Sequence, residues 1–224
     1  MEFPAYIYYG FIALTLVYLF VLYSAFGKNI KFLVFSISWL AITATLAATG
    51  VYAITDMMPP LIFVSVWLFF GLGLFFIYSK TTQSQRANIS LQRLHYYHTV
   101  RIFVETIFLY NLAKLGMVSD VMSFEGRNFD IIIGLSAPLI IWLYFYKAYI
   151  SKTLLKAWNI IGFCILAFTV SQATLSAPWP LQQFSFEQPT AAILYFPMVW
   201  LPTFLAPAAL LCHLLALKLM RERK

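Results

Sequence analysis

The length of the apolar stretches constrains this fold most, because they run for about twenty residues between short polar segments. Roughly 20 apolar residues carry an α-helix across the hydrocarbon core of a bilayer. Inside that core the backbone must satisfy its own hydrogen bonds, as a helix does. Only 10% of the residues are charged, against about 25% in soluble domains. The sequence therefore predicts an all-α, polytopic membrane protein.

We predict a bundle of seven transmembrane helices forming a single domain over residues 1–224. The predicted spans cover about residues 6–26, 32–54, 60–79, 95–117, 131–150, 155–175 and 191–217. With this arrangement, 12 of the 15 basic residues fall on one side of the membrane and most acidic residues on the other. The positive-inside rule then places the N-terminus outside and the C-terminus in the cytoplasm. The net charge of +7 reflects this topology, so we predict no nucleic-acid partner.

The fourth span carries an unusual set of ionisable residues, His98, Arg101 and Glu105. At 100° per residue they share one face of a helix, and Arg101 and Glu105 are spaced to pair directly. A charged residue in the membrane costs roughly 2.5–3.5 kcal/mol on insertion scales, and such residues often mark functional sites. The cluster is therefore either a substrate or proton site, or a polar lock between helices.

Two further spans add polar candidates. His213 in the last span lies at a depth comparable to that of His98, so the pair could relay protons or ligate haem. We predict no cofactor and no metal, and keep haem as the alternative. Covalent retinal is excluded because the last span has no lysine before Lys218. Thr169 and Gln172 lie on one stripe of the sixth span and either line a pocket or bond neighbouring helices.

Two outer loops are richer in charge and aromatic residues than simple connectors. The first, residues 121–130, carries Glu125, Arg127 and Asp130. The second, residues 177–197, contains four prolines and Glu187, and its apolar character predicts that it folds back onto the outer rim. Arg127 is spaced to pair with Glu125 or Asp130, and Glu187 is a further candidate partner that would join the two loops, as a structural clasp or as part of a ligand contact.

Three segments carry a resemblance to a known group of proteins: HTVRIFVE, MSFEGRNFDIIIGLSAP and QQFSFEQPTAAILYFPMVWLPTF. They resemble an uncharacterised group of bacterial seven-helix integral membrane proteins of about this length. The resemblance implies a location in the bacterial inner (plasma) membrane and implies no activity.

The sequence supports three hypotheses about function. The first is a protein that binds or transports a small amphipathic or anionic molecule, held by Arg101, with Glu105 and His98 moving protons. The second is an intramembrane lipid-modifying enzyme with Glu105 and His98 as acid and base, which would also need a nucleophile or a metal that the sequence does not clearly offer. The third is a non-catalytic receptor or assembly partner in which the charged cluster is a structural lock. All three imply contact with membrane lipid.

Overall fold

Every regular element of the computed structural model, which describes residues 1–223, is helical. Five helices are long and apolar enough to cross a membrane. They are α1 (Ala5–Ala25), α2 (Ile30–Ala48), α3 (Leu61–Tyr78), α9 (Lys152–Ser176), and the π-helical turn η7 (Leu201–Leu205) continued by α10 (Ala206–Glu222). The all-α prediction is confirmed for the described residues, and the five apolar helices make a membrane location plausible.

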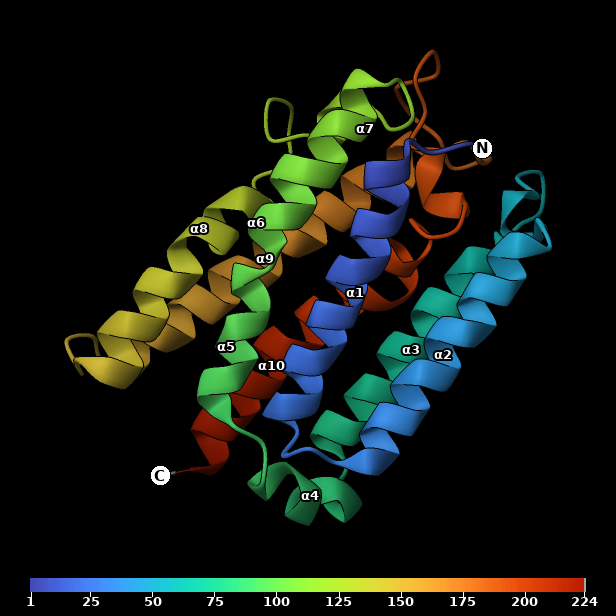
Figure 1. The fold of residues 1–224 in the computed structure, drawn as a ribbon. Helices are drawn as coiled ribbons and strands as arrows, with labels where there is room; N and C mark the ends of the chain where they lie inside the picture. Colours follow the sequence, from blue (N-terminus) through green and yellow to red (C-terminus); the bar gives the residue numbers. More distant parts are fainter. Residues whose placement is uncertain (224) are drawn as a thin grey trace.

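Two further helical rods are interrupted. One runs through α5 (Leu91–Thr99), α6 (Arg101–Phe103), the π-helical turn η3 (Val104–Leu109) and α7 (Tyr110–Lys114). These segments follow one another along one side of the bundle (Figure 1). The other joins α8 (Asp130–Ile141) to the π-helical turn η5 (Trp142–Tyr146). A π-helical turn is wider than an α-helical one and is frequent at functional sites. Neither rod is therefore one regular α-helix.

Short elements connect the long helices. They are η1 (Val51–Ala53), η2 (Lys80–Thr82), α4 (Gln83–Ala87), η4 (Asp120–Met122) and η6 (Ala192–Leu194). Several long helices begin at a side chain that accepts backbone N–H groups, as N-cap residues do. The caps are Asn29 for α2, Ser90 for α5 and Ser151 for α9. These polar residues therefore fix where the apolar helices start.

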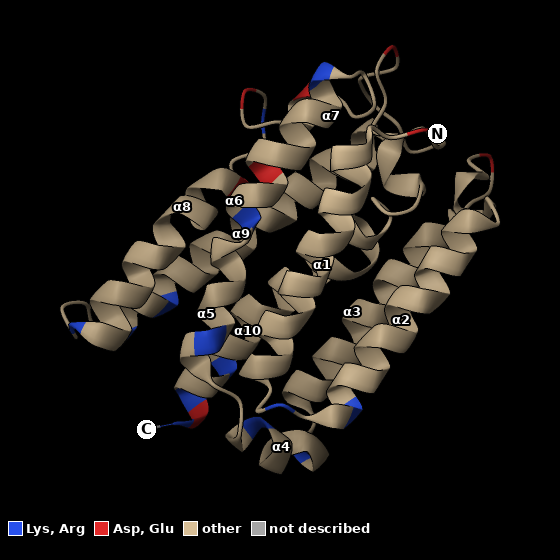
Figure 2. Cartoon of the chain, viewed as in Figure 1, with Lys and Arg blue, Asp and Glu red and all other residues tan. Residues whose placement is uncertain are grey.

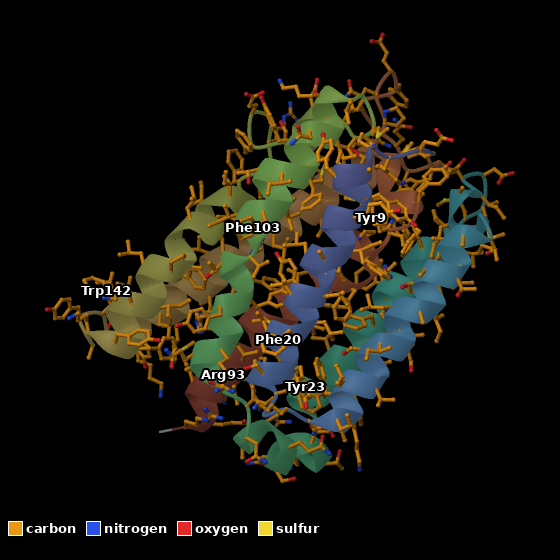
Figure 3. The ribbon with its side chains drawn as sticks, in the orientation of Figure 1. Tyr9, Phe20, Tyr23, Arg93, Phe103 and Trp142 are labelled. Atoms are coloured by element: carbon orange, nitrogen blue, oxygen red, sulfur yellow. The ribbon has the colours of Figure 1, made fainter. Side chains whose placement is uncertain are left out.

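The last helix forms the centre of the bundle. It packs against α9, α3 and α5, and 67% of its apolar stretch is buried, against 17% for α3. Figure 1 shows α10 behind α5 and α1. Apolar side chains on the surrounding helices face outward, among them Tyr9, Phe20, Phe103 and Trp142 (Figure 3). Such an apolar outer surface suits contact with lipid.

The two ends of the bundle differ in charge (Figure 2). Most lysines and arginines gather near α4, the C-terminus and the turn between α8 and α9, whereas acidic residues gather near the N-terminus and α7. We call these the basic end and the acidic end. The charge separation predicted from the sequence is thus present along the long axis of the molecule.

The last span begins later than predicted. The sequence analysis placed it at residues 191–217, but continuous helix starts only at Trp200 and extends to Glu222. Residues 177–199 form turns and the short η6 at the acidic end, where Ala192 N–H donates to Met117 O at 3.0 Å. Pro197 contributes to the late start, because proline lacks the N–H that an upstream helical turn would need.

Arg86 in α4 ties the basic end together. Its guanidinium donates to the carbonyls of Phe76 and Ser79 at the end of α3, at 2.9 and 2.8 Å. It also forms an ion pair with Glu222 at the end of α10, at 2.8 Å. Because Arg86 is 2% exposed, these bonds are made largely out of water. One side chain therefore joins the ends of α3 and α10.

We expect Arg86→Ala to lower the free energy of unfolding by about 2–3 kcal/mol, since a charged hydrogen-bond network is lost and buried acceptors remain. Denaturant titration of the detergent-solubilised protein would measure this. Arg93→Ala is the matched control, because Arg93 is exposed and makes one side-chain hydrogen bond, to Ser24 O. It should change stability by less than about 0.5 kcal/mol. Equal effects of the two variants would contradict the role given to Arg86.

Candidate functional site

Arg101 forms a buried ion pair with Asp130 instead of with Glu105. The Arg101 side chain lies at the start of α6 and Asp130 in the first turn of α8. Within residues 1–223, Arg101 and Glu105 do not form the expected ion pair. The physical reason is local: the helix widens into η3 at Val104, so Glu105 does not keep its α-helical position relative to Arg101. An outer-loop candidate thus joins the intramembrane cluster.

Glu105 is bound instead by Asn128 of the loop before α8. The Asn128 amide Nδ2 donates to Glu105 Oε2 at 2.5 Å and to Met122 O at 2.9 Å. Its Oδ1 accepts from the Thr169 hydroxyl at 3.2 Å and from the Asp130 N–H at 3.1 Å. Asn128 therefore connects Glu105 to α8 and α9. Thr169 bonds a neighbouring segment, which is one of the two roles predicted for it.

A chain of hydrogen bonds runs from Arg101 to the basic half of the molecule. Arg101 Nη1 lies 3.5 Å from His213 Nε2, and His213 Nδ1 lies 3.2 Å from Asn159 Oδ1. The Asn159 amide donates to His95 Nε2 at 3.0 Å, and His95 Nδ1 lies 2.8 Å from Leu91 O. Both imidazoles then carry their proton on Nδ1, which is the only assignment in which every group has a complementary partner. Each donor in this series of hydrogen bonds therefore points toward the basic half of the molecule.

His98 lies beside this chain of hydrogen bonds and contacts the rings of His213 and His95. The rings of His98 and His213 stack with centroids 3.8 Å apart and planes inclined by 17°. Trp158 packs edge-on to His98, with ring centroids 5.6 Å apart. His98 and His213, which the sequence predicts at comparable depth, are therefore in direct contact. The Nδ1 atom of His98 is buried and has no hydrogen-bond partner within residues 1–223.

This stack does not fit a haem held by two histidines. Axial ligands direct one ring nitrogen each at the iron from opposite faces of the macrocycle. His98 and His213 instead present their ring faces to one another, and both nitrogens of His213 lie next to Arg101 and Asn159. Within the described chain no group of three or more His, Cys, Asp or Glu side chains is placed to hold a metal ion.

A cavity of about 570 Å³ lies beside the charged cluster. Its volume falls within the range of about 300–1,000 Å³ that is usual for small-molecule sites. Arg101, Glu105, Asp130 and Tyr18 contribute its charged and phenolic surface. The remaining walls are mostly apolar side chains, chiefly of α3, α9, η7 and α10, with the hydroxyls of Thr169, Ser171 and Thr174 on α9. The cavity therefore combines a polar floor with mostly apolar walls.

The cavity reaches the outer surface of the bundle between α3 and α9. Trp67 on α3 is 67% exposed, and Ala167 and Ser171 on α9 are exposed too, yet all three line the cavity. Both helices are among the five that could cross a membrane. The mouth consequently lies on the apolar surface and not at either charged end.

The proline-containing start of the last helix is held by side chains from two other helices. Pro207 has no N–H to offer the carbonyl of Thr203, and the indole of Trp39 on α2 donates to that oxygen at 2.9 Å. The hydroxyl of Tyr97 on α5 donates to the carbonyl of Leu205, also at 2.9 Å. The Trp39 bond satisfies the carbonyl that Pro207 would otherwise leave unpaired in this helix.

The other predicted site residues lie apart from the cavity. Glu125 pairs with Lys114 at 2.8 Å on the exposed surface. The expected clasp between Arg127 and Glu187 is absent from the ion pairs of residues 1–223. Gln188, the neighbour of Glu187, donates instead to Val118 O at 2.6 Å and so joins the second outer loop to the backbone just before the first. Short neutral contacts therefore replace the predicted charge pair.

Four polar residues of the site were not among the predicted site residues: Tyr18, His95, Asn128 and Asn159. Asn159 offered a signal, because a polar amide stands in the apolar run WNIIGFC and such residues usually bond across helices in membranes. Asn128 was predicted only as a turn or cap residue. Gln172 is buried, and its Oε1 has no hydrogen-bond partner within the described residues.

A family model described as Domain of unknown function (DUF8737) matches residues 58–221, which is most of the chain. The chain belongs to this family. No curated protein and no solved structure matches it. The DUF8737 segment contains every charged residue of the site and every cavity residue except Tyr18. The candidate site is thus a feature of the region that defines the family.

Proposed function

We propose that this protein binds a small amphipathic molecule that enters laterally from the bilayer. The observation that carries the proposal is the cavity of about 570 Å³, whose walls are mostly apolar and whose floor carries Arg101, Glu105 and Asp130. A molecule with one polar end and one apolar end matches both surfaces. Its apolar part would leave lipid through the mouth between α3 and α9 without crossing water.

We also propose the membrane arrangement in which this site would work. The two interrupted rods, α5 to α7 and α8 with η5, complete seven spans with the five long helices. The positive-inside rule then places the basic end in the cytoplasm and the N-terminus outside, in a bacterial inner membrane. The cavity would lie in the outer half of the bilayer, because its walls use the parts of α3 and α9 nearest the acidic end.

The geometry favours binding over transport, over an enzyme and over a purely structural lock. Transport by rocking of the last helix would have to break the bonds that Trp39 and Tyr97 make to its carbonyls. An enzyme that used Glu105 and His98 as acid and base would need both at the ligand, but His98 does not line the cavity. If the charged cluster were only a structural lock, the cavity and its mouth would have no role.

The test is to close the mouth. We expect the wild-type protein in nanodiscs to bind at least one radiolabelled dodecyl amphiphile saturably, from a set with anionic, neutral and cationic head groups. Ala167→Trp should abolish the saturable component, because a large ring at this exposed lining position would fill the entrance.

Ala41→Trp is the matched control. Ala41 is exposed on α2 and does not line the cavity, so this variant should bind as the wild type does. The proposal fails if no amphiphile of the set binds saturably, or if Ala167→Trp leaves the saturable binding unchanged.

A further inference from the structure

The charges on the cavity floor do not balance. Arg101 is the only basic residue among the described residues that line the cavity, and it is paired with Asp130. Glu105 is 3% exposed and its side-chain partner is the neutral amide of Asn128. The floor thus carries two carboxyl groups and one guanidinium, and the group without a charged partner is Glu105.

A buried carboxylate is stabilised by a positive charge in direct contact. No lysine, histidine or second arginine lines the cavity within residues 1–223. The nearest charged or titratable groups on the packed elements are Arg101 on α6, Asp130 on α8 and Tyr18 on α1. Because Arg101 already neutralises Asp130, the protein itself offers no free cation to Glu105.

The walls of the cavity suit a cation as well. Aromatic rings line it from three helices: Tyr18 on α1, Phe63, Trp67 and Phe70 on α3, and Phe163 on α9, with Trp179 from the loop that follows. The face of an aromatic ring attracts ammonium groups, and quaternary ammonium ligands are bound in this way. A carboxylate among aromatic rings is therefore complementary to an organic cation, and an anionic head would meet two carboxyl groups.

We infer that the head group of the amphipathic ligand is a cation, an amine or a quaternary ammonium, held against Glu105 with its alkyl or aromatic part between α3 and α9. This inference rests on the proposed function, because it names the ligand class of the same cavity. It replaces the expectation that Arg101 holds an anionic group, since Asp130 occupies that guanidinium.

The experiment compares three probes that share one dodecyl chain: dodecyltrimethylammonium, dodecanol and dodecyl sulfate. Each is radiolabelled and titrated against wild-type protein in nanodiscs of zwitterionic lipid, with the signal of Ala167→Trp subtracted. We expect dodecyltrimethylammonium to bind at least ten-fold more tightly than either of the others. Glu105→Gln, which keeps the shape and an oxygen acceptor for Asn128, should remove this preference and leave dodecanol binding unchanged.

The outcomes separate the two proposals. Equal affinity for the three probes, or preference for dodecyl sulfate, overturns the cationic head and leaves amphiphile binding in place. Saturable binding of none of the probes removes the binding function itself. If Glu105→Gln does not fold, the order of affinities in the wild-type protein still decides the question. A preference for the cation that survives in a folded Glu105→Gln protein would overturn the role of Glu105.

Discussion

Asp130→Ala is expected to lower the free energy of unfolding by about 3–5 kcal/mol, the cost of leaving one member of a buried ion pair without its partner. Both side chains are almost inaccessible to water, at 5% and 4% exposure, so the freed guanidinium of Arg101 has no solvent to replace the lost carboxylate. Titration of the solubilised protein with dodecyl sulfate, followed by circular dichroism, would measure the loss. This is one of the two largest effects that the structure predicts.

Two controls give this experiment its meaning. Glu125→Ala breaks the pair with Lys114, whose side chains are 58% and 51% exposed, and should cost less than about 1 kcal/mol. The double variant Arg101→Met with Asp130→Leu removes both charges and should recover much of the loss, as apolar replacements of buried pairs often do. A double variant as unstable as Asp130→Ala would show that more than the unpaired charge destabilises the single variant.

The class of fold could be predicted from the sequence because one physical requirement dominates it. Long apolar stretches need helices in lipid, and the charge bias along the chain matches the two ends seen in the structure (Figure 2). The start of the last helix was wrong by about ten residues. Hydropathy alone treats residues 191–200 as part of a span, whereas backbone geometry around Pro197 keeps them in turns.

The site was predicted less completely, and the reason is geometric. Helical periodicity predicted that His98, Arg101 and Glu105 share one face of a helix, and all three are buried in the structure. It could not show the π-helical turn η3, which begins at Val104 and contains Glu105. Nor could it place Asp130, which is remote in the chain.

The structure divides the predicted cluster into two parts. Arg101, Asp130, His213, Asn159 and His95 bond one another and have the character of a lock. Glu105 lines the cavity, and within residues 1–223 its side chain hydrogen-bonds to the neutral amide of Asn128. The choice between lock and site, which the sequence left open for the cluster as a whole, can therefore be made separately for each part.

The lock depends on the absence of a side chain at Gly162 of α9. A Cβ atom built there would lie 2.4 Å from Cε1 and 2.7 Å from Nε2 of His213, closer than van der Waals contact allows. The ring has little freedom to retreat, because it stacks on His98 and its nitrogens face Arg101 and Asn159. A methyl group at this position would therefore displace His213 from the chain of hydrogen bonds.

We expect Gly162→Ala to lower the free energy of unfolding by about 2–5 kcal/mol, from overpacking and from buried polar groups that lose a partner. Gly71→Ala is the matched control: this glycine has no atom within 4 Å of the new Cβ, so the change should be neutral or stabilise by up to about 1 kcal/mol. In a His213→Ala background the Gly162→Ala change should cost almost nothing more, because the clashing ring is gone. The same unfolding titration measures all five proteins, namely the wild type, the three single variants and the double variant. A full cost of Gly162→Ala without His213 would refute the contact as its cause.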